Sequence, residues 1–418
     1  MANLVAIPYG SGFYNLKLNH KLDILKSKEL IPVNNLEKEL LKKLNGPIGT
    51  RSLNLLLKNK NDICIVVSDN TRPVPNKPIL NTLIPYILGL GIKKENITIL
   101  VATGSHETLT NFQLADLYGE DIYKNFKIVC SDCYRSDDFA DIGYIADGTP
   151  IKINKVFLKA DFKITIGLIE PHPFAGFSGG RKSVCPGLID VESFKVMHGT
   201  EMVFSKYNEV GMLENNRFHH IATEVAKKTG VDFIINISID KGKKITNLFC
   251  GDLVQAFDEG VRFVKNTSKI KAKKEYDLII THGGGTGLDS YYYQLAKPIN
   301  IATHYLNPLG KIIVFGKCDR GLGTPVFSGM LENANNWEEV IEHINSSKEF
   351  ISEQWNVQFV YSVIKKAKTF LFSDYYERYP LLEKLTPRVK DINRFIEAMK
   401  RQKEDMKIGF IEDGPFSI

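Results

Sequence analysis

The chain has 418 residues, of which 43% are hydrophobic and 24% are charged, and its formal net charge is +6. This length predicts two or three domains, and the composition excludes a disordered chain. The small, scattered positive charge favours anionic small ligands over a nucleic-acid surface. The chain starts without the pattern of a signal peptide, and no window reaches the roughly 20 apolar residues of a membrane helix. We therefore expect a cytoplasmic protein that binds neither nucleic acid nor a membrane.

Short β-branched runs alternate with helical patterns along the chain, which indicates βα units around mostly parallel sheets. The predicted fold class is α/β, with two domains that each hold a mostly parallel sheet flanked by helices. The N-terminal domain covers 1–267, a charged linker occupies 267–276, the C-terminal domain covers 275–406, and a tail over 407–418 packs back on the N-terminal domain. Predicted strands lie at 62–68, 96–103, 126–131, 162–169, 232–239, 276–285 and 310–316, and predicted helices follow Pro78 and cover 218–228, 253–266, 337–346 and 380–402.

Reactive side chains follow three of the predicted strands. Asp69 and Arg72 come after the first strand, His106 after the second and His172 after the fourth. Ligands bind at the carboxyl ends of the strands in open α/β sheets, so these residues predict a site at that edge. The two histidines suit acid–base chemistry, because an imidazole changes charge near neutral pH.

A glycine loop comes directly after His172. Its sequence, GFSGGRKS over 176–183, nearly matches the phosphate loop G-x-x-x-x-G-K-[ST], but Arg181 stands where the second glycine should be. In a phosphate loop the glycines turn backbone N–H groups toward phosphates and the lysine adds a charge. The loop therefore indicates either a degenerate nucleotide site or a site that presents Lys182 to another anionic ligand.

Three further features have alternative interpretations. The pair Cys130 and Cys133 lacks the second pair or the histidines of a zinc site, so we expect reduced thiols. His198 follows a predicted helix and is either a surface residue or a metal ligand, and one histidine cannot hold a metal without other donors. The cluster GGGTG over 283–287 does not match G-x-G-x-x-G, which favours a tight turn over a dinucleotide site.

The residues alone thus indicate a two-domain α/β protein that binds a small anionic ligand between its domains. Arg72, Lys182 and Lys297 supply cations suited to a carboxylate or a phosphate. Tyr293 lies four residues before Lys297, which places both on one face of a predicted helix.

The ordered set DNTRPVP, GSH, HPFAGFSGGRK, MHGT and YQLAK, from position 69 to 297, resembles the nickel-dependent lactate racemase family, and Gln354-Trp355 also fits. The resemblance implies a two-domain α/β fold with the site in the interdomain cleft. It implies a racemase or epimerase of a 2-hydroxy acid, either lactate or a related acid. It also implies, as partners, the enzymes that make the cofactor and insert nickel.

The cofactor of this family is a nickel-pincer nucleotide, a pyridinium mononucleotide with sulfur donors that is attached covalently to a lysine. By resemblance, that lysine is Lys182 and the protein ligand of nickel is His198, while the cofactor brings the other donors. The remaining residues implied by the resemblance are Asp69, Gly179, Gly180 and Trp355 for the cofactor and Arg72, Tyr293, Gln294 and Lys297 for the substrate.

The resemblance also implies a mechanism. His106 or His172 takes the hydroxyl proton while a hydride leaves Cα for the cofactor, which gives a planar 2-keto acid. Return of the hydride to the opposite face, with the other histidine as proton donor, inverts the centre. Hydride removal avoids a carbanion beside a carboxylate. Two alternatives are a degenerate phosphate-loop protein that binds nucleotides without hydride chemistry, and a binding or regulatory protein that keeps the fold without the cofactor.

Overall fold

The structure is a computed structural model that describes residues 3–272, 275–332, 334–347 and 349–417, and the chain divides into two units. The larger unit comprises Glu29–His198 and Ser205–Thr267. The smaller unit comprises Met1–Lys28, Gly199–Phe204 and Ser268–Ile418. The N-terminal strands therefore pack with the C-terminal part of the chain, whereas chain order placed them in the first domain. The predicted linker at 267–276 lies partly outside the described residues.

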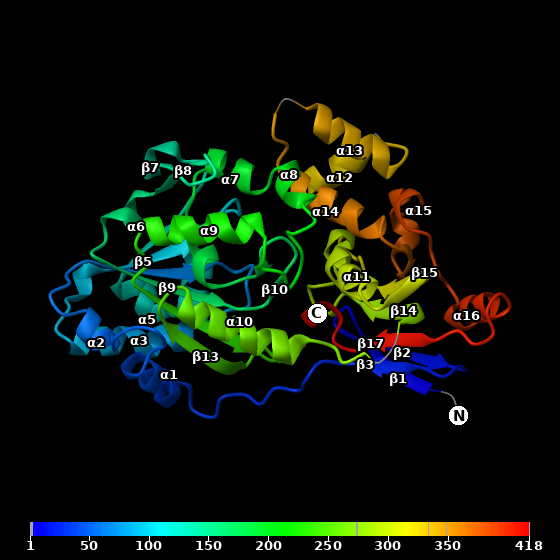
Figure 1. The fold of residues 1–418 in the computed structure, drawn as a ribbon, viewed down its shortest axis with the longest axis horizontal. Helices are drawn as coiled ribbons and strands as arrows, with labels where there is room; N and C mark the ends of the chain where they lie inside the picture. Colours follow the sequence, from blue (N-terminus) through cyan, green and yellow to red (C-terminus); the bar gives the residue numbers. More distant parts are fainter. Residues whose placement is uncertain (1–2, 273–274, 333, 348, 418) are drawn as a thin grey trace. The chain divides into compact units, whose positions relative to one another are not determined.

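In its described residues, the larger unit is built on a six-stranded sheet with the order β13-β12-β9-β4-β5-β6 (Figure 1). Neighbouring strands are parallel except at the edge, where β13 runs antiparallel to β12. The sheet strands are β4 (Ile63–Ser68), β5 (Ile97–Ala102), β6 (Lys127–Cys130), β9 (Phe162–Leu168), β12 (Phe233–Ile239) and β13 (Ile245–Gly251). The five strands predicted for this domain are confirmed, and β13 was missed.

Helices cover both faces of this sheet. Ile65 and Ile99 on one face join a single apolar core with Leu40 and Leu83 of two helices, α1 and α3. On the other face, the helices α9 and α10 lie over the strands (Figure 1). Helices and short turns of this unit are α1 (Leu36–Asn45), α2 (Leu53–Leu56), α3 (Asn76–Gly89), η1 (Lys94–Asn96), α4 (Asn111–Tyr118), α5 (Glu120–Asn125), η2 (Ser136–Asp138), α6 (Lys155–Lys159), η3 (Gly180–Ser183), α7 (Val191–Met197), α9 (Arg217–Lys228) and α10 (Gln255–Ser268). Two hairpins complete it, β7 (Phe139–Tyr144) with β8 (Pro150–Asn154), and β10 (Pro171–His172) with β11 (Gly176–Phe177).

The strand order of the larger unit reverses beside β4. From β4 the chain adds β5 and β6 on one side, and then returns to add β9 and β12 on the other side. Such a reversal leaves a crevice at the carboxyl ends of the strands, where open α/β sheets bind ligands. The segments after β4, β5 and β9 all meet this edge.

The smaller unit, as far as it is described, holds a parallel five-stranded sheet with the order β16-β15-β14-β17-β3. Its strands are β3 (Asp23–Leu25), β14 (Tyr276–His282), β15 (Leu306–Phe315), β16 (Lys368–Phe372) and β17 (Ile408–Ile411), and a separate hairpin joins β1 (Asn3–Tyr9) to β2 (Gly12–Leu18). The helices and turns are α8 (Thr200–Val203), η4 (Tyr292–Leu295), α11 (Ala296–Thr303), α12 (Pro325–Glu332), α13 (Trp337–Ser346), α14 (Gln354–Ile364), η5 (Tyr376–Arg378), α15 (Leu381–Leu385), α16 (Ile392–Lys400) and η6 (Gly414–Phe416).

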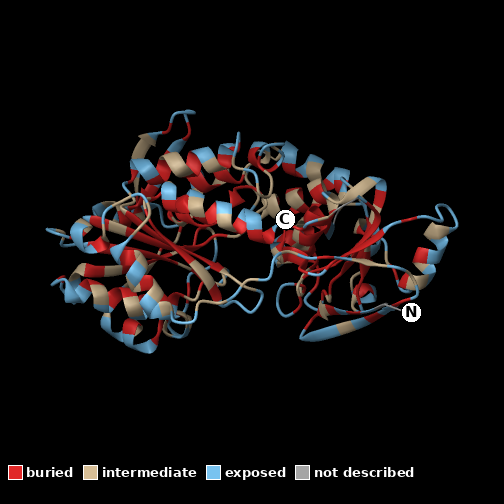
Figure 2. Cartoon of the chain, turned by 60° about the horizontal axis from the view of Figure 1, so that its bottom comes forward, coloured by how far each residue is buried: buried red, intermediate tan, exposed pale blue. Residues whose placement is uncertain are grey.

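Both faces of the smaller sheet are also covered. Helices α11 to α14 share one apolar core with strand residues such as Ile312, while the β1–β2 hairpin and α16 share another with residues such as Phe315. Figure 2 shows the resulting burial of the strands in red. The fold class is thus confirmed: the protein is α/β, with two units that each carry a mostly parallel sheet. Among the described helices, none has the length and apolarity needed to cross a bilayer.

Two predicted elements of the smaller unit differ in the structure. The helix predicted at 380–402 is two helices, α15 and α16, because Pro387 cannot donate a backbone hydrogen bond and interrupts the pattern. The strand predicted at 276–285 ends at His282, and the glycine cluster that follows is a turn. A Cβ on Gly285 would lie 3.2 Å from the carbonyl oxygen of Gly10. The turn therefore packs closely against the backbone at Gly10, with little room for a side chain.

Asn216 joins the start of α9 to the loop of the β10–β11 hairpin, which follows His172. Its side-chain oxygen accepts from the His219 amide at 2.8 Å, and its Nδ2 donates to the carbonyls of Phe174 at 2.8 Å and Met212 at 2.9 Å. The residue is fully buried. It therefore caps the helix and holds the loop with one side chain.

We expect Asn216→Ala to lower the free energy of unfolding by about 2–4 kcal/mol, since it removes a cap and two buried hydrogen bonds. Urea unfolding monitored by circular dichroism measures the change. Asn216→Asp keeps the cap acceptor but sets a buried carboxylate oxygen against two carbonyl oxygens, so it should cost at least as much. A loss below about 0.5 kcal/mol in Asn216→Ala would contradict this role.

Candidate active site

The candidate site lies at the carboxyl edge of the larger sheet. Asp69 and Arg72 follow β4, His106 follows β5, and His172 follows β9 on the short strand β10. Because β4 lies between β5 and β9, the three segments emerge side by side. The strand order, which the sequence could not give, brings these residues to one place.

Asp69 and His106 form a hydrogen-bonded pair. The Asp69 Oδ2 lies 2.7 Å from His106 Nδ1, and its Oδ1 accepts from the Thr71 hydroxyl at 2.6 Å and the Thr71 amide at 3.1 Å. Burial alone would raise the pKa of Asp69, but the hydrogen bonds from His106 and Thr71, with the charge of Arg72, hold it below its usual value. An ionised Asp69 accepts the Nδ1 proton, so His106 carries its lone pair on Nε2. This is the arrangement of a general base.

His172 is held in the opposite tautomer. Its Nδ1 accepts hydrogen bonds from the backbone amides of Phe174 and Ala175, each at 3.2 Å. A neutral imidazole that accepts at Nδ1 carries its proton on Nε2. That Nε2 lies 2.7 Å from Nζ of Lys182.

Lys182 projects from the turn η3 and is half-buried. Its pKa lies well below the usual value, because of burial first and then the positive charges of Arg72 and Arg181. The ring of Phe218 lies 5.2 Å from Nζ. Burial and the two cations favour the neutral amine, whereas a ring face at this distance favours the charged form.

The glycine loop is fastened to the end of β9 by Ser178. The Ser178 hydroxyl donates to the carbonyl of Leu168 at 2.6 Å and accepts from the Glu170 amide at 3.0 Å. Gly179 and Gly180 follow with φ of 81° and 52°, a conformation that glycine adopts without strain. A Cβ on Gly179 would lie 3.0 Å from the carbonyl of Leu168. The glycines therefore allow the loop to run directly against the strand end.

Arg181 is fully buried beneath this loop. Its guanidinium donates to the carbonyls of Ala175 at 2.8 Å and Gly179 at 3.3 Å, and lies 4.2 Å from the ring centre of Phe257. Burial lowers the pKa of Arg181 to about 9, so the group is still charged at neutral pH. The residue that departs from the phosphate-loop pattern thus ties the loop to the hairpin that carries His172.

His198 lies at the carboxyl end of α7, whose start is capped by the side chain of Asp190. The imidazole stacks on Phe194 at 3.9 Å, and Phe218 meets it edge-on at 5.7 Å. Nδ1 lies 3.3 Å from the Phe194 carbonyl and donates to it, which puts the lone pair on Nε2. Burial lowers the pKa of His198 to about 3. The ring is therefore neutral, in the tautomer that a metal ligand requires.

The other predicted site residues lie in the smaller unit. Tyr293 and Gln294 belong to η4, Lys297 to the first turn of α11, and Trp355 to α14. The Tyr293 ring packs 5.5 Å from that of Phe327. Lys366, which follows the end of α14, donates to Asn300 of α11 at 3.1 Å. Tyr293, Gln294, Lys297 and Trp355 each have partial solvent exposure.

Several residues of the site were not identified from the sequence. Phe218 contacts both Lys182 and His198, and Thr71 hydrogen-bonds the Asp69 carboxylate. Asn236 accepts the Gly180 amide at 3.1 Å. Phe218 was expected only as a helix residue, because a periodic pattern identifies a buried face without saying what that face meets.

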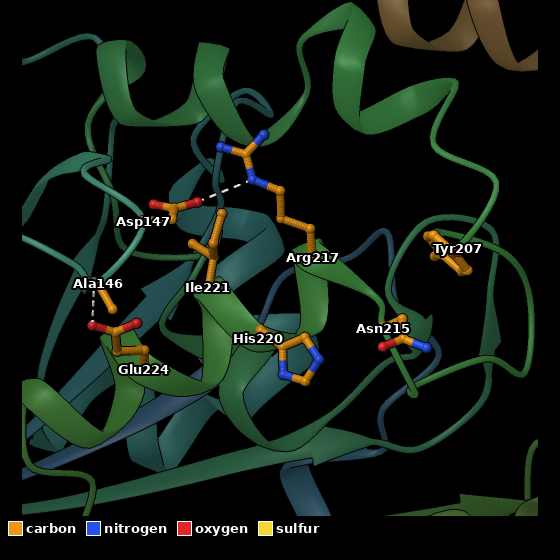
Figure 3. Close-up of a pocket in the computed structure, with 8 residues that line it drawn as sticks. All are labelled: Ala146, Asp147, Tyr207, Asn215, Arg217, His220, Ile221 and Glu224. Atoms are coloured by element: carbon orange, nitrogen blue, oxygen red, sulfur yellow. Dashed lines mark hydrogen bonds and ion pairs between the residues drawn. The ribbon is translucent and has the colours of Figure 1, made fainter.

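A pocket of about 550 Å³ on the larger unit lies apart from this site (Figure 3). Its charged groups are already paired, since Arg217 Nε lies 3.0 Å from Asp147 and Glu224 accepts the Ala146 amide at 2.7 Å. Neither candidate histidine lines it, and Lys182 does not line it either. The pocket therefore does not compete with the sheet edge as the active site.

Fold and site define an α/β protein with paired acid–base side chains and a lysine of lowered pKa at the switch point of its larger sheet. Family models for the lactate racemase N-terminal and C-terminal domains match residues 9–211 and 271–418. The chain belongs to the lactate racemase family, and it is an enzyme of the isomerase class.

Individual relatives agree with this assignment. The lactate racemase of Thermoanaerobacterium thermosaccharolyticum is 34% identical over 99% of this chain and 98% of its own length. The lactate racemase of Lactiplantibacillus plantarum is 33% identical over 89% of this chain and 88% of its own. The structure of the Thermoanaerobacterium lactate racemase apoprotein matches all of this chain and 99% of its own with a TM-score of 0.89 and 32% identity. A protein from Thermotoga maritima, 15% identical over 92% of this chain and 99% of its own with a TM-score of 0.65, shares the fold.

Two histidines with lowered pKa values give the stability of this protein a definite pH dependence. The pKa of His219, which stacks on Phe257, is lowered to about 3 by burial and by Arg181, as low as that of His198. In the unfolded chain both rings protonate near pH 6.5, so the unfolded state binds more protons between about pH 3 and 6.5. The free energy of unfolding should therefore fall as the pH drops from 7 to 4.

We expect His219→Phe, which keeps the ring stack and removes the titrating group, to lower this pH slope by at most about 1.4 kcal/mol per pH unit. Chemical unfolding at pH 7, 6 and 5 measures the slope. His220→Phe, at the neighbouring exposed position, serves as the control. Equal slopes in His219→Phe and the unaltered protein would contradict the prediction.

Proposed function

We propose that this protein is a racemase or epimerase of a 2-hydroxy acid, lactate or a related acid, and that it works through a planar 2-keto acid. The observation that carries the proposal is the pairing of His106 with a buried, ionised Asp69 at the same sheet edge as Lys182. Family membership supports the reaction type. It leaves the identity of the acid to experiment.

His106 is the candidate base for the substrate hydroxyl. Asp69 holds Nδ1–H and leaves the Nε2 lone pair for the proton, and the carboxylate then stabilises the imidazolium that forms. Arg72 follows the same strand and carries a fixed positive charge suited to the substrate carboxylate. His172 is the second acid–base group, and it can act once its Nε2 leaves Lys182.

The donor groups of the site fit a nickel-pincer nucleotide. Within the part of the chain that the structure describes, no three His, Cys, Asp or Glu side chains form a metal site, so His198 needs donors from a bound group. A neutral imidazole and a neutral amine both contact Phe218. In this proposal Lys182 is the covalent attachment point and His198 the nickel ligand. When bound, the group accepts and returns the substrate hydride.

The remaining assignments rest on family membership. We propose that Gly179 and Gly180 let the loop approach the nucleotide closely, and that Trp355 covers it. Tyr293, Gln294 and Lys297 stay assigned to the substrate. Partial solvent exposure of these four side chains of the smaller unit supports their availability to ligands. The enzymes that make the cofactor and insert nickel are the implied partners.

The phosphate-loop alternative has less support. The Gly180 amide donates to Asn236 at 3.1 Å and the Lys182 amide to the Gly179 carbonyl at 3.1 Å, so these two groups are engaged within the protein. The turn η3 covers only Gly180–Ser183, whereas a phosphate loop opens a long helix. Calorimetric titration with magnesium-ATP tests this alternative directly, and binding at the loop would favour it.

We expect co-expression with the cofactor-making enzymes to add mass at Lys182 and stoichiometric nickel. Lys182→Ala should lose the adduct, whereas His198→Gln should keep the adduct and lose nickel. Intact-mass analysis, metal measurement and chiral product analysis on a panel of 2-hydroxy acids check these outcomes. Racemisation by a Lys182→Ala protein without the adduct would refute the assignment.

We expect Asp69→Asn to lower kcat by roughly 100-fold or more, with the Lys182 adduct retained. An asparagine amide donates to Nδ1 and moves the His106 proton to Nε2, the wrong tautomer for a base. Thr71→Val, which removes one bond to the carboxylate and keeps the histidine contact, should cost less. Steady-state kinetics on the loaded enzyme decide the point, and a twofold loss or less in Asp69→Asn would count against His106 as the base.

A further inference from the structure

The contact between His172 and Lys182 identifies the protonation state of the lysine. His172 Nδ1 accepts two backbone amides, so the proton of the neutral ring lies on Nε2, the atom 2.7 Å from Nζ. An ammonium group has only donors, and it would oppose this N–H with another N–H. A neutral amine has a lone pair that accepts from Nε2–H. The hydrogen-bond geometry therefore requires Lys182 as an amine.

Buried side chains hold in place the two residues whose backbone amides donate to His172 Nδ1, and this fixes the tautomer of His172. The carbonyl of Phe174 accepts from Asn216 at 2.8 Å, and the carbonyl of Ala175 accepts from Arg181 at 2.8 Å. These bonds hold the two residues whose amides donate to Nδ1. The imidazole is consequently locked while the hairpin loop keeps this conformation.

The charges that face Lys182 act in the same direction. Arg72 comes from the loop after β4 and Arg181 from η3, whereas Glu170, after β9, is the one acidic residue among the strongest influences. The thiol of Cys185, at the end of the glycine loop, is protonated because burial raises its pKa to about 12. His198, after α7, is neutral. Two cations against one carboxylate disfavour an ammonium at this position.

We propose that His172 is a positioning residue for covalent modification of Lys182, and that it presents this side chain as a neutral nucleophilic amine to activated acyl donors. The inference rests on the proposed function, in which Lys182 is the attachment point, and it adds how the apoprotein prepares that point. In the step, Nζ forms a bond to the acyl carbon. The bond from that carbon to its leaving group breaks, and the leaving group departs with the bonding electron pair and takes up the proton that the nitrogen loses.

Acylation also changes His172. An amide nitrogen delocalises its lone pair and does not accept hydrogen bonds, so Nε2–H loses its acceptor when Lys182 is modified. The contact that prepared the lysine must then break. Loading thereby releases the ring for the acid–base role that the proposed function gives it.

Trace acetylation of the apoprotein with N-hydroxysuccinimidyl acetate tests the inference, with peptide mass mapping at pH 7 and pH 9. An amine with an ordinary pKa reacts about 100-fold faster at pH 9 than at pH 7, after correction for reagent hydrolysis. Free Nα-acetyl-lysine, added to the same reaction, is the reference for that rise. Lys182 should rise less than about tenfold, and this ratio does not depend on how accessible the side chain is.

His172→Phe should keep the shallow pH dependence of Lys182, because burial, Arg72 and Arg181 remain. It should lower the labelling rate of Lys182 at pH 7 by about tenfold, because Nζ loses the group that positions it. His172→Gln, whose amide N–H can replace Nε2–H, should restore the rate, and His220→Phe, at an exposed position, should not alter it. Circular dichroism confirms the fold of each variant. A steep pH dependence at Lys182 in the unaltered protein, or an unchanged labelling rate in folded His172→Phe, would overturn the inference.

The two proposals fail separately. If the labelling rate of Lys182 depends only weakly on pH, but co-expression gives neither adduct nor racemisation, the proposed function is refuted and the amine assignment stands. If the labelling rate of Lys182 rises steeply with pH, but co-expression gives both adduct and racemisation, only the proposed role of His172 is refuted.

Discussion

The buried guanidinium of Arg181 is the constraint on which the site depends. It is fully buried, it binds the carbonyls of Ala175 and Gly179, and it lies against the face of Phe257. Burying a cation costs free energy, which hydrogen bonds and an aromatic face offset in part. Nε of this group finds no hydrogen-bond partner among the described residues, so the compensation is incomplete. In return, one side chain fixes both the glycine loop and the hairpin that orients His172.

The strand order of the larger sheet supplies the second constraint. Parallel strands with all carboxyl ends at one edge bring segments 37 residues and more apart in sequence into contact, as the Asp69–His106 pair shows. One face of the sheet packs into a single apolar core, which provides rigid support. The candidate site residues lie on loops, where polar side chains can reach solvent, and the strands set the positions of these loops.

Much of this could be predicted from the sequence. The buried strands appear as β-branched runs, and the positions of Asp69, His106 and His172 follow from the rule that ligands bind at strand ends. The partners of these residues could not be predicted. Whether Asp69 meets His106 or Arg72 depends on loop geometry, and the tautomers depend on backbone amides that carry no sequence signature. The N-terminal strands were missed because β3 gains its stability from β17, almost 400 residues away, rather than from a local pattern.

Asn216 has a further consequence for dynamics. Since one side chain both caps α9 and binds the carbonyl of Phe174, the first turn of the helix and the histidine loop cannot loosen independently. We therefore expect the amide protons of Phe174 and Ala175 to exchange with solvent together with those of the first turn of α9. The rigidity of the His172 imidazole is in this way linked to the local stability of α9.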